Sequence, residues 1–295
     1  DLATEQTHSV FEEKLADPLD VSITEAAWQV FEVVNENMVT AFREYAASRG
    51  IDTRGLSMTA LGGAGPVHAF RVARKLDIED VVCPYGAGVG SSLGLTEAPR
   101  MYEASATNQA VLATLSADDI QRQFDPLYDE AADVLARADI QPTDAKIHLS
   151  LDMRHVDQGH EIKVPLEGYA IADVTPDAVR EAFEQAYRET FNRDTLDFPV
   201  EVLTYRLELS EPDHDAEAAE LAAPAGGAED PGPRDVYFGT DVGRVETHAY
   251  RWENLNAGQT LEGPLVVEAD QTTVVADPES TVEVADNYDI TINLQ

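Results

Sequence analysis

The chain has 295 residues, with 20 lysines and arginines against 56 aspartates and glutamates, a formal net charge of -36 and 43% hydrophobic residues. This acidity disfavours binding to nucleic acids and anionic membranes, because phosphate contacts need clustered lysine and arginine. The hydrophobic content favours a globular chain over a disordered one, and no apolar run reaches the roughly 18 residues of a membrane span. From the length we expect about two domains.

The charge and the cysteine content also bear on habitat and compartment. Molar salt shortens the Debye length to about 3 Å, so that the acidic side chains repel one another less. The high negative charge therefore favours a halophilic protein with an acidic surface. The single cysteine, Cys83, excludes an intramolecular disulfide and suits a reducing cytoplasm. The chain starts at Asp1 without a signal-peptide pattern. We therefore expect a fragment, a processed product or a trimmed piece of a longer protein.

The first part of the chain predicts two helices. Residues 22–49 carry apolar side chains at three- and four-residue spacing, which is typical of one helix face. Ser22 and Glu25 have the spacing of a capping box, and Gly50 is placed to end the helix. A shorter helix is expected at about 3–15.

A strand, a glycine turn, a helix and a second strand are predicted next. The strands are expected at 57–61 and 80–84, and the helix at about 66–76. This order is typical of a βαβ unit with a parallel sheet. A second glycine-rich segment, YGAGVGSSLGL at 85–95, follows at once. Ligands collect at the carboxyl ends of strands in such sheets, so two glycine segments that each follow a strand favour a site there.

The remaining elements predict an α+β region and a β module. In chain order we expect a helix at 116–138, strands at 146–153 and 160–166 joined as a hairpin, a helix at 176–191 and a strand at 199–210. Residues 211–233 are acidic, alanine-rich and broken by proline and glycine, which indicates a linker or surface loop. Alternating segments then predict short strands at 234–238, 245–251, 261–268, 272–276, 281–284 and 289–294. The expected fold class is α/β with α+β and a C-terminal all-β module, divided as 1–100, 101–210 and 234–295.

The run LGGAGPVHAF, residues 61–70, is the main candidate site. Gly62, Gly63 and Gly65 permit positive φ and remove Cβ atoms, and the following helix directs its amides and dipole at the turn. The run is neither a Walker loop nor G-x-G-x-x-G. Both a tight strand-to-helix turn and a nucleotide contact stay open. His68 is a candidate acid/base or phosphate-orienting group, or a residue hydrogen-bonded locally at the helix start.

Two other features could carry chemistry. The segment LDMRHVDQGHEIKV gathers Asp152, Arg154, His155, Asp157, His160 and Glu161. Its spacing matches no strong metal motif, which favours a salt-bridged hairpin over a Zn²⁺ or Mn²⁺ site. Asp152 and Arg154 share a strand face and could pair with each other. Cys83 has no sequence neighbour that would lower its pKa, which favours a buried cysteine over a nucleophile.

Several stretches together resemble the hydantoinase A / 5-oxoprolinase family. RGLSMTALGGAGPVHAFRVARKLDIEDVVCPYGAGVGSSLGL is similar to that family's GGAGP-H turn, alanine-containing helix, strand ending in proline and S-x-L-G segment. Residues 151–164 resemble its D-x-R-Y-x-G-Q-x-x-E stretch, with His155 for the aromatic residue and Asp157 for the glycine. Residues 251–284 resemble its C-terminal module, with L-x-x-G, E-G-P and a T-T-V-V run. Acetone and acetophenone carboxylase subunits share this architecture.

The resemblance implies one lobe of an actin-like, sugar-kinase-like ATPase with family-specific C-terminal domains. Such enzymes use ATP and Mg²⁺ to phosphorylate an amide or carbonyl oxygen of the substrate, here a small cyclic amide. Gly62, Gly63, Ala64 and Gly65 would contact the nucleotide, and His68 would be a candidate catalytic residue. A hydantoinase B-like subunit would complete hydrolysis. A ketone carboxylase subunit and a non-catalytic scaffold for partner subunits are the alternatives.

One departure from the family pattern changes what we expect of this chain. The family's D-x-G-G-T-x-T-D phosphate loop does not occur in the sequence. The chain is therefore expected to be the C-terminal portion of the family architecture, with the N-terminal ATPase half as a partner, and to be inactive toward ATP by itself. The departures at His155 and Asp157 leave the role of that hairpin open, and no metal site is expected there.

Overall fold

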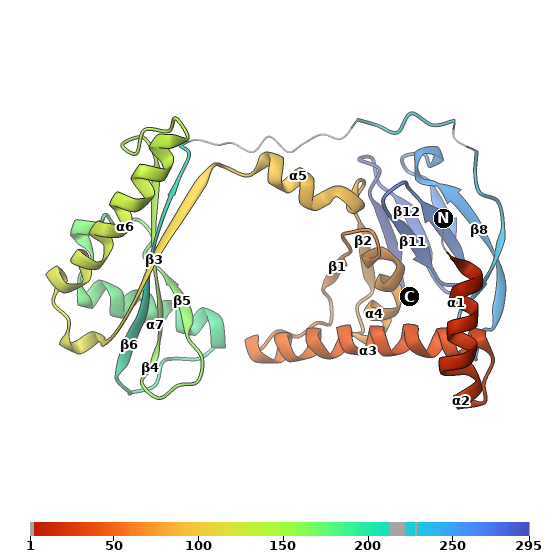
Figure 1. Cartoon of the computed structure of the whole chain (residues 1–295), viewed down its shortest axis with the longest axis horizontal. Coiled ribbons are helices and arrows are strands. Elements are labelled where there is room, and N and C mark those ends of the chain that lie inside the picture. The colour runs from red at the N-terminus through yellow and green to blue at the C-terminus, as the bar shows by residue number, and fades with distance from the viewer. Residues whose placement is uncertain (1–2, 213–221, 228, 295) are drawn as a thin grey trace. The chain divides into compact units, whose positions relative to one another are not determined.

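The computed structural model describes residues 3–212, 222–227 and 229–294, which form a mixed α/β fold with several sheets (Figure 1). The chain divides into two compact units: unit 1 combines Asp1–Thr96 with Ala219–Gln295, and unit 2 is Glu97–Ala218. Within the described ranges, none of the helices combines the length and the apolar character that crossing a bilayer requires. Much of the linker predicted at 211–233 lies outside the described residues.

The helices predicted at about 3–15, 22–49 and 66–76 lie close to their predicted positions, whereas the helix at residues 90–97 was not predicted. The helical elements of this part are α1 (Thr4–Phe11), a π-helical turn (Glu12–Ala16), α2 (Asp17–Leu19), α3 (Ile23–Arg49), α4 (Gly65–Lys75), a 3₁₀ turn (Ala87–Val89) and α5 (Gly90–Glu97). The capping box predicted for α3 is confirmed: the Ser22 side chain accepts from the Glu25 amide, and the Glu25 carboxylate accepts from the Ser22 amide. Gly50 ends α3 in the left-handed conformation, which glycine adopts without a Cβ penalty.

Unit 1 contains two sheets. Its strands are β1 (Ser57–Thr59), β2 (Asp80–Cys83), β7 (Arg234–Tyr237), β8 (Arg244–Arg251), β9 (Thr260–Glu262), β10 (Leu265–Glu268), β11 (Thr273–Ala276), β12 (Thr281–Val284) and β13 (Ile290–Asn293), with a 3₁₀ turn at Trp252–Asn254. The five-stranded sheet has the order β1-β2-β13-β12-β9, and the four-stranded sheet has the order β11-β10-β8-β7. β1 and β2 pair in parallel, so the predicted βαβ unit is confirmed.

The separate β module expected at 234–295 does not form a unit of its own. β13 pairs with β2, and β12 and β9 follow it in the same sheet. Side chains from α4, β2, β10 and β13, among them Phe70, Val81, Val267 and Ile292, are buried in one core. Alternation predicts a strand locally but not its partner, and strands of four residues need neighbours to bury their apolar face.

Polar contacts also connect α4 to the end of the chain. The Arg74 guanidinium donates to both carboxylate oxygens of Asp277, at 2.5 and 2.9 Å, and to the carbonyl oxygen of Leu294 at 3.2 Å. Burial alone would raise the pKa of the Asp277 carboxyl, but hydrogen bonds from Arg74 and Ser280 hold that pKa below its ordinary value. An ionised Asp277 thus holds α4 to the loop between β11 and β12.

Unit 2 is an antiparallel sheet covered by helices. Its elements are β3 (Met101–Val111), a 3₁₀ turn (Leu112–Thr114), α6 (Ala117–Arg137), β4 (Lys146–His155), β5 (Ile162–Pro165), a second 3₁₀ turn (Ile171–Asp173), α7 (Pro176–Phe191) and β6 (Val200–Ser210), with strand order β3-β6-β4-β5. Leu149 and Leu151 of β4 are buried in one core with Phe124 of α6 and Phe183 of α7. Both helices therefore cover the same sheet face, and the predicted hairpin of β4 and β5 is confirmed.

Candidate functional site

The glycine turn lies where β1 ends and α4 begins. Pairing between β1 and β2 continues as the Ala60 amide donates to the Val82 carbonyl at 2.8 Å. The Gly62 amide then donates to the Ala87 carbonyl at 2.8 Å, which joins the two glycine-rich segments. Gly62 has φ of +86°, a conformation that side-chain-bearing residues rarely adopt. The turn thus occupies the carboxyl end of a parallel strand pair, the edge where α/β sheets bind ligands.

Three consecutive backbone amides at this turn are free. The N–H groups of Gly63, Ala64 and Gly65 have no hydrogen-bond partner among the described residues, and all three residues are exposed. Ala64 is the N-cap of α4 and supplies no side-chain cap. Free amides at a helix start, added to the positive end of the helix dipole, form a site for an anion.

The free N-terminus of α4 contrasts with three other helix starts in the chain. Ser22, Ser116 and Thr175 each accept a hydrogen bond from an amide in the first turn of α3, α6 and α7. A side-chain cap of this kind satisfies one of the amides that a helix start leaves free. The three longest helices thus have side-chain caps, whereas α4, like α1 and α2, has none.

Residues of the turn between β10 and β11 contact the glycine turn. The Thr272 hydroxyl donates to the Gly62 carbonyl at 3.0 Å. A Cβ at Gly63 would lie 3.0 Å from the Gln271 carbonyl oxygen, and a Cβ at Gly88 would lie 2.5 Å from the same atom. Two of the glycines are therefore required by close approach of the chain's own backbone. Gln271 and Thr272 were not predicted as site residues, although Thr272 lies in the quoted T-T-V-V run.

Gly65 has a different environment from Gly63 and Gly88. A Cβ built on Gly65 meets no atom of the described chain within 4 Å, and its φ lies outside the left-handed region. Packing within the described chain therefore does not require glycine at this position. Backbone conformation does favour it, because Gly65 is helical and precedes Pro66, and a Cβ on the residue before a proline disfavours the helical conformation.

The second glycine segment is mostly helical and not a loop. Residues 87–89 form a 3₁₀ turn and residues 90–97 form α5. Ala87 is buried and accepts from the Gly62 amide, while Ser91 and Ser92 are exposed. The residues from Gly86 onward can continue as a helix because only Gly86 has positive φ.

His68 faces α3 and does not point away from the helix pair into open solvent. Its Nδ1 lies 3.0 Å from Oδ1 of Asn35, and its ring stacks on Phe31 with centroids 4.9 Å apart. Asn35 is fully buried. Burial lowers the pKa of His68 below its ordinary value, so the ring is neutral at neutral pH. This arrangement fixes the ring between the two helices.

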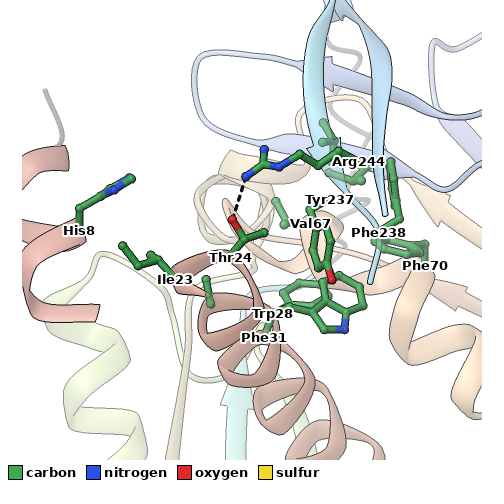
Figure 2. A pocket seen from close by; sticks show the side chains of 13 residues that line it. His8, Ile23, Thr24, Trp28, Phe31, Val67, Phe70, Tyr237, Phe238 and Arg244 are labelled. Carbon is green, nitrogen blue, oxygen red and sulfur yellow. Dashed lines mark hydrogen bonds between the residues drawn. The ribbon is translucent and has the colours of Figure 1, made fainter. Parts of the chain in front are cut away.

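An apolar cavity of about 400 Å³ lies beside α3 and α4. Figure 2 shows the rings of Trp28, Phe70, Tyr237 and Phe238 around it, and the hydrogen bond of 2.8 Å that Arg244 donates to the Thr24 hydroxyl. None of the four residues of the glycine turn lines this cavity. It is therefore separate from the free amides of α4.

The polar hairpin of β4 and β5 is a salt-bridged structure, as predicted, but its pairs differ from the predicted one. Asp152 accepts from Arg206 at 2.8 Å, and Arg154 donates to Glu201 at 2.8 Å. The partners come from β6, because the adjacent strand brings opposite charges closer than a residue two positions along the same strand. Within the described part of the chain, no three histidine, cysteine, aspartate or glutamate side chains gather as a metal site.

Cys83 is fully buried in β2, as predicted. Burial raises the pKa of its thiol to about 12, with a smaller contribution from Asp289. The thiol therefore stays protonated at neutral pH and cannot act as a nucleophile.

Comparison with known proteins agrees with the mixed α/β fold. The chain is 26% identical to the caprolactamase subunit alpha of Pseudomonas jessenii, over 90% of this chain and 39% of that protein. It is 28% identical to the acetophenone carboxylase gamma subunit of Aromatoleum aromaticum, over 92% of this chain and 38% of that protein. The chain thus spans about two fifths of the length of these relatives.

A solved structure has a similar fold. The crystal structure of the ATP-dependent caprolactamase from Pseudomonas jessenii matches 97% of this chain and 42% of its own chain, with a TM-score of 0.71 and 23% identity. At the level of families, the description Hydantoinase/oxoprolinase matches residues 1–104, and the description Hydantoinase/oxoprolinase C-terminal domain matches residues 106–291. Because these two matches cover nearly every residue, the chain belongs to the hydantoinase/oxoprolinase family.

Proposed function

We propose that this chain is the C-terminal part of an ATP-dependent cyclic-amide hydrolase of the hydantoinase or 5-oxoprolinase type. In this proposal unit 1 is one lobe of an actin-like ATPase, and Gly62, Gly63, Ala64 and Gly65 form one wall of its nucleotide cleft. The observation that carries the proposal is the row of three free, exposed amides at the uncapped start of α4. Such a row suits a phosphate or another acceptor group of a nucleotide.

The residues of the glycine turn are better suited to bind ATP than to bind Mg²⁺. Backbone amides donate hydrogen bonds to phosphate oxygens, whereas Mg²⁺ needs carboxylate and water oxygens. The described residues do not gather three acidic or histidine ligands. We therefore assign the Mg²⁺ ligands to the nucleotide phosphates and to the N-terminal ATPase half. His68, neutral and fixed by Asn35, is a hydrogen-bonding group near the cleft rather than a cation.

The chemistry in this proposal divides between polypeptides. The amide oxygen of the substrate takes the γ-phosphoryl group of ATP, and ADP leaves. At a hydantoinase B-like subunit water then adds to the activated carbon, the ring C–N bond breaks and phosphate is released. This chain positions the nucleotide, because phosphoryl transfer depends on positioning and charge stabilisation. Support comes from relatives that are themselves named as subunits, alpha and gamma.

A ketone carboxylase is the second candidate. The identity of 28% to an acetophenone carboxylase gamma subunit favours it as much as the caprolactamase similarity favours the hydrolase. The substrate distinguishes the two. A hydrolase releases ADP with 5-oxoproline, hydantoin or caprolactam, whereas a carboxylase releases ADP with acetone or acetophenone only when bicarbonate is present.

The test uses the chain assembled with the rest of the family length and with the partner subunit. Substrate-dependent ADP release is measured for wild type, Gly65→Val and Gly159→Val. Both glycines have open space at the Cβ position and φ outside the left-handed region, so both variants should fold, as circular dichroism would verify. We expect Gly65→Val to raise the KM for ATP by about tenfold or more, because its side chain would keep a phosphate oxygen away from the amide and so weaken one charge-assisted hydrogen bond, and we expect Gly159→Val to leave the KM unchanged. An unchanged KM for ATP in folded Gly65→Val would remove the nucleotide role of this turn.

A further inference from the structure

Unit 2 contains a small cavity at the end of β4 that the proposed nucleotide site does not use. It has a volume of about 220 Å³ and lies between His155, the start of α7 and the segment before β6. A water molecule takes up about 30 Å³ of liquid. The cavity is therefore large enough for a small organic molecule and too small for a nucleotide.

His155 leaves hydrogen-bonding groups unsatisfied at this cavity. Its side chain is 4% exposed, and neither Nδ1 nor Nε2 has a hydrogen-bond partner among the described residues. Phe183 and Tyr187 lie against the ring in edge-to-face geometry, with centroid distances of 5.3 and 5.2 Å. An aromatic face offers an N–H donor only a weak contact and offers a nitrogen lone pair no donor, so burying these groups is unfavourable.

Charged side chains of both signs line the same cavity without pairing. Arg180 is, within the described ranges, the one arginine that makes no hydrogen bond, ion pair or ring contact. The side chains of Glu184 and Asp197 also line the cavity and make no hydrogen bond or ion pair with another described residue. Arg180 and Asp197 are exposed and Glu184 is half-buried, so these side chains are accessible to a ligand from solvent.

The charge pattern defines the chemistry of an occupant. Arg180 favours a carboxylate, but two carboxylates beside it disfavour a simple anion. An ammonium group on the same molecule would face Glu184 and Asp197. We infer that this cavity binds a small amino acid, with its carboxylate on Arg180, its ammonium group on Glu184 and Asp197, and the His155 ring as a further hydrogen-bonding partner.

The inference stands apart from the proposed nucleotide site, because none of its residues belongs to unit 1. The probes are β-alanine as the zwitterion, with acetate and methylammonium as its separate charged halves. The ring signals of His155 are followed by NMR at constant ionic strength while each probe is added. We expect β-alanine to shift these signals and to bind about tenfold or more tightly than either half, because it makes both sets of charge-assisted hydrogen bonds.

Variants on α7 assign the contacts. Arg180→Gln should weaken β-alanine binding by about tenfold or more, since it removes one charge-assisted partner. Arg188→Gln is the matched control: Arg188 is exposed on the same helix and does not line the cavity, so affinity should not change. If acetate binds as tightly as β-alanine, the inference that the cavity recognises both charges of an amino acid is wrong. His155 signals that do not move with about 0.1 M of any probe would overturn the site and leave only water as the partner of the ring.

Discussion

Replacement of Gly88 by alanine tests whether the two glycine segments are shaped by the chain itself. The new Cβ would lie 2.5 Å from the carbonyl oxygen of Gln271, 2.6 Å from its Cβ and 2.7 Å from its carbonyl carbon. These are mostly backbone atoms, so rotation of a side chain cannot relieve the contact. Overpacking of this kind costs about 1–3 kcal/mol. For a unit of this size each kcal/mol lowers Tm by about 2–4 °C, so we expect a decrease of about 2–12 °C.

Gly65→Ala is the control for the Gly88 experiment. Its Cβ meets nothing within 4 Å, so Gly65→Ala causes no overpacking, although a Cβ before Pro66 disfavours the helical conformation of residue 65. The Tm, monitored by circular dichroism at one salt concentration, should therefore fall more for Gly88→Ala than for Gly65→Ala. A Tm for Gly88→Ala equal to that of wild type would refute the close approach to Gln271 on which the shape of the turn depends.

Four further outcomes follow from contacts outside the turn. Asp277→Asn removes the carboxylate that pairs with Arg74 and should lower the unfolding free energy by about 3 kcal/mol in urea titrations. This value is at the lower end of the cost of breaking a buried ion pair, because Arg74 is partly exposed. Since the pKa of Asp277 is held below its ordinary 3.8, this stabilisation is complete above about pH 4 and is lost as pH falls through the folded pKa, so the wild type and Asp277→Asn should converge in acid. The Cys83 thiol, with its pKa raised to about 12, should react with a thiol reagent at pH 8 only at the rate at which unit 1 opens; fast labelling would contradict its burial. Phe124→Ala, at a fully buried side chain of unit 2, should cost about 3–5 kcal/mol and lower only the unfolding transition of that unit.

Elements with local causes could be predicted from the sequence. The capping box of Ser22 and Glu25 and the left-handed Gly50 lie within a few residues of the helix ends that they determine. The βαβ order of β1, α4 and β2 follows from short apolar runs and a glycine turn between them. These elements do not depend on residues far away in the sequence, so local patterns are enough to predict them.

Elements with distant causes could not be predicted. β3 alternates Tyr102, Ala104 and Ala106 with polar residues, but only Ala104 among its first eight residues is fully buried, and the strand forms because β6 supplies its hydrogen-bonding partner. The ion pair of Arg154 forms with Glu201, 47 residues away, for the same reason. β12 and β13 join β2 across about 200 residues. Pairing of strands is decided by the whole fold, which one sequence does not reveal.

The candidate site combines both kinds of cause. A glycine-rich turn before a helix is visible in the sequence, but the reason for each glycine is not. Gly62 is required by its positive φ, and Gly63 and Gly88 are required by the backbone of Gln271, which lies more than 180 residues away in the sequence. Gly65 is required by neither. A side chain at Gly65 would disturb no neighbour in the described chain, so a raised KM for ATP in folded Gly65→Val, with an unchanged KM in Gly159→Val, distinguishes a nucleotide site from a tight turn.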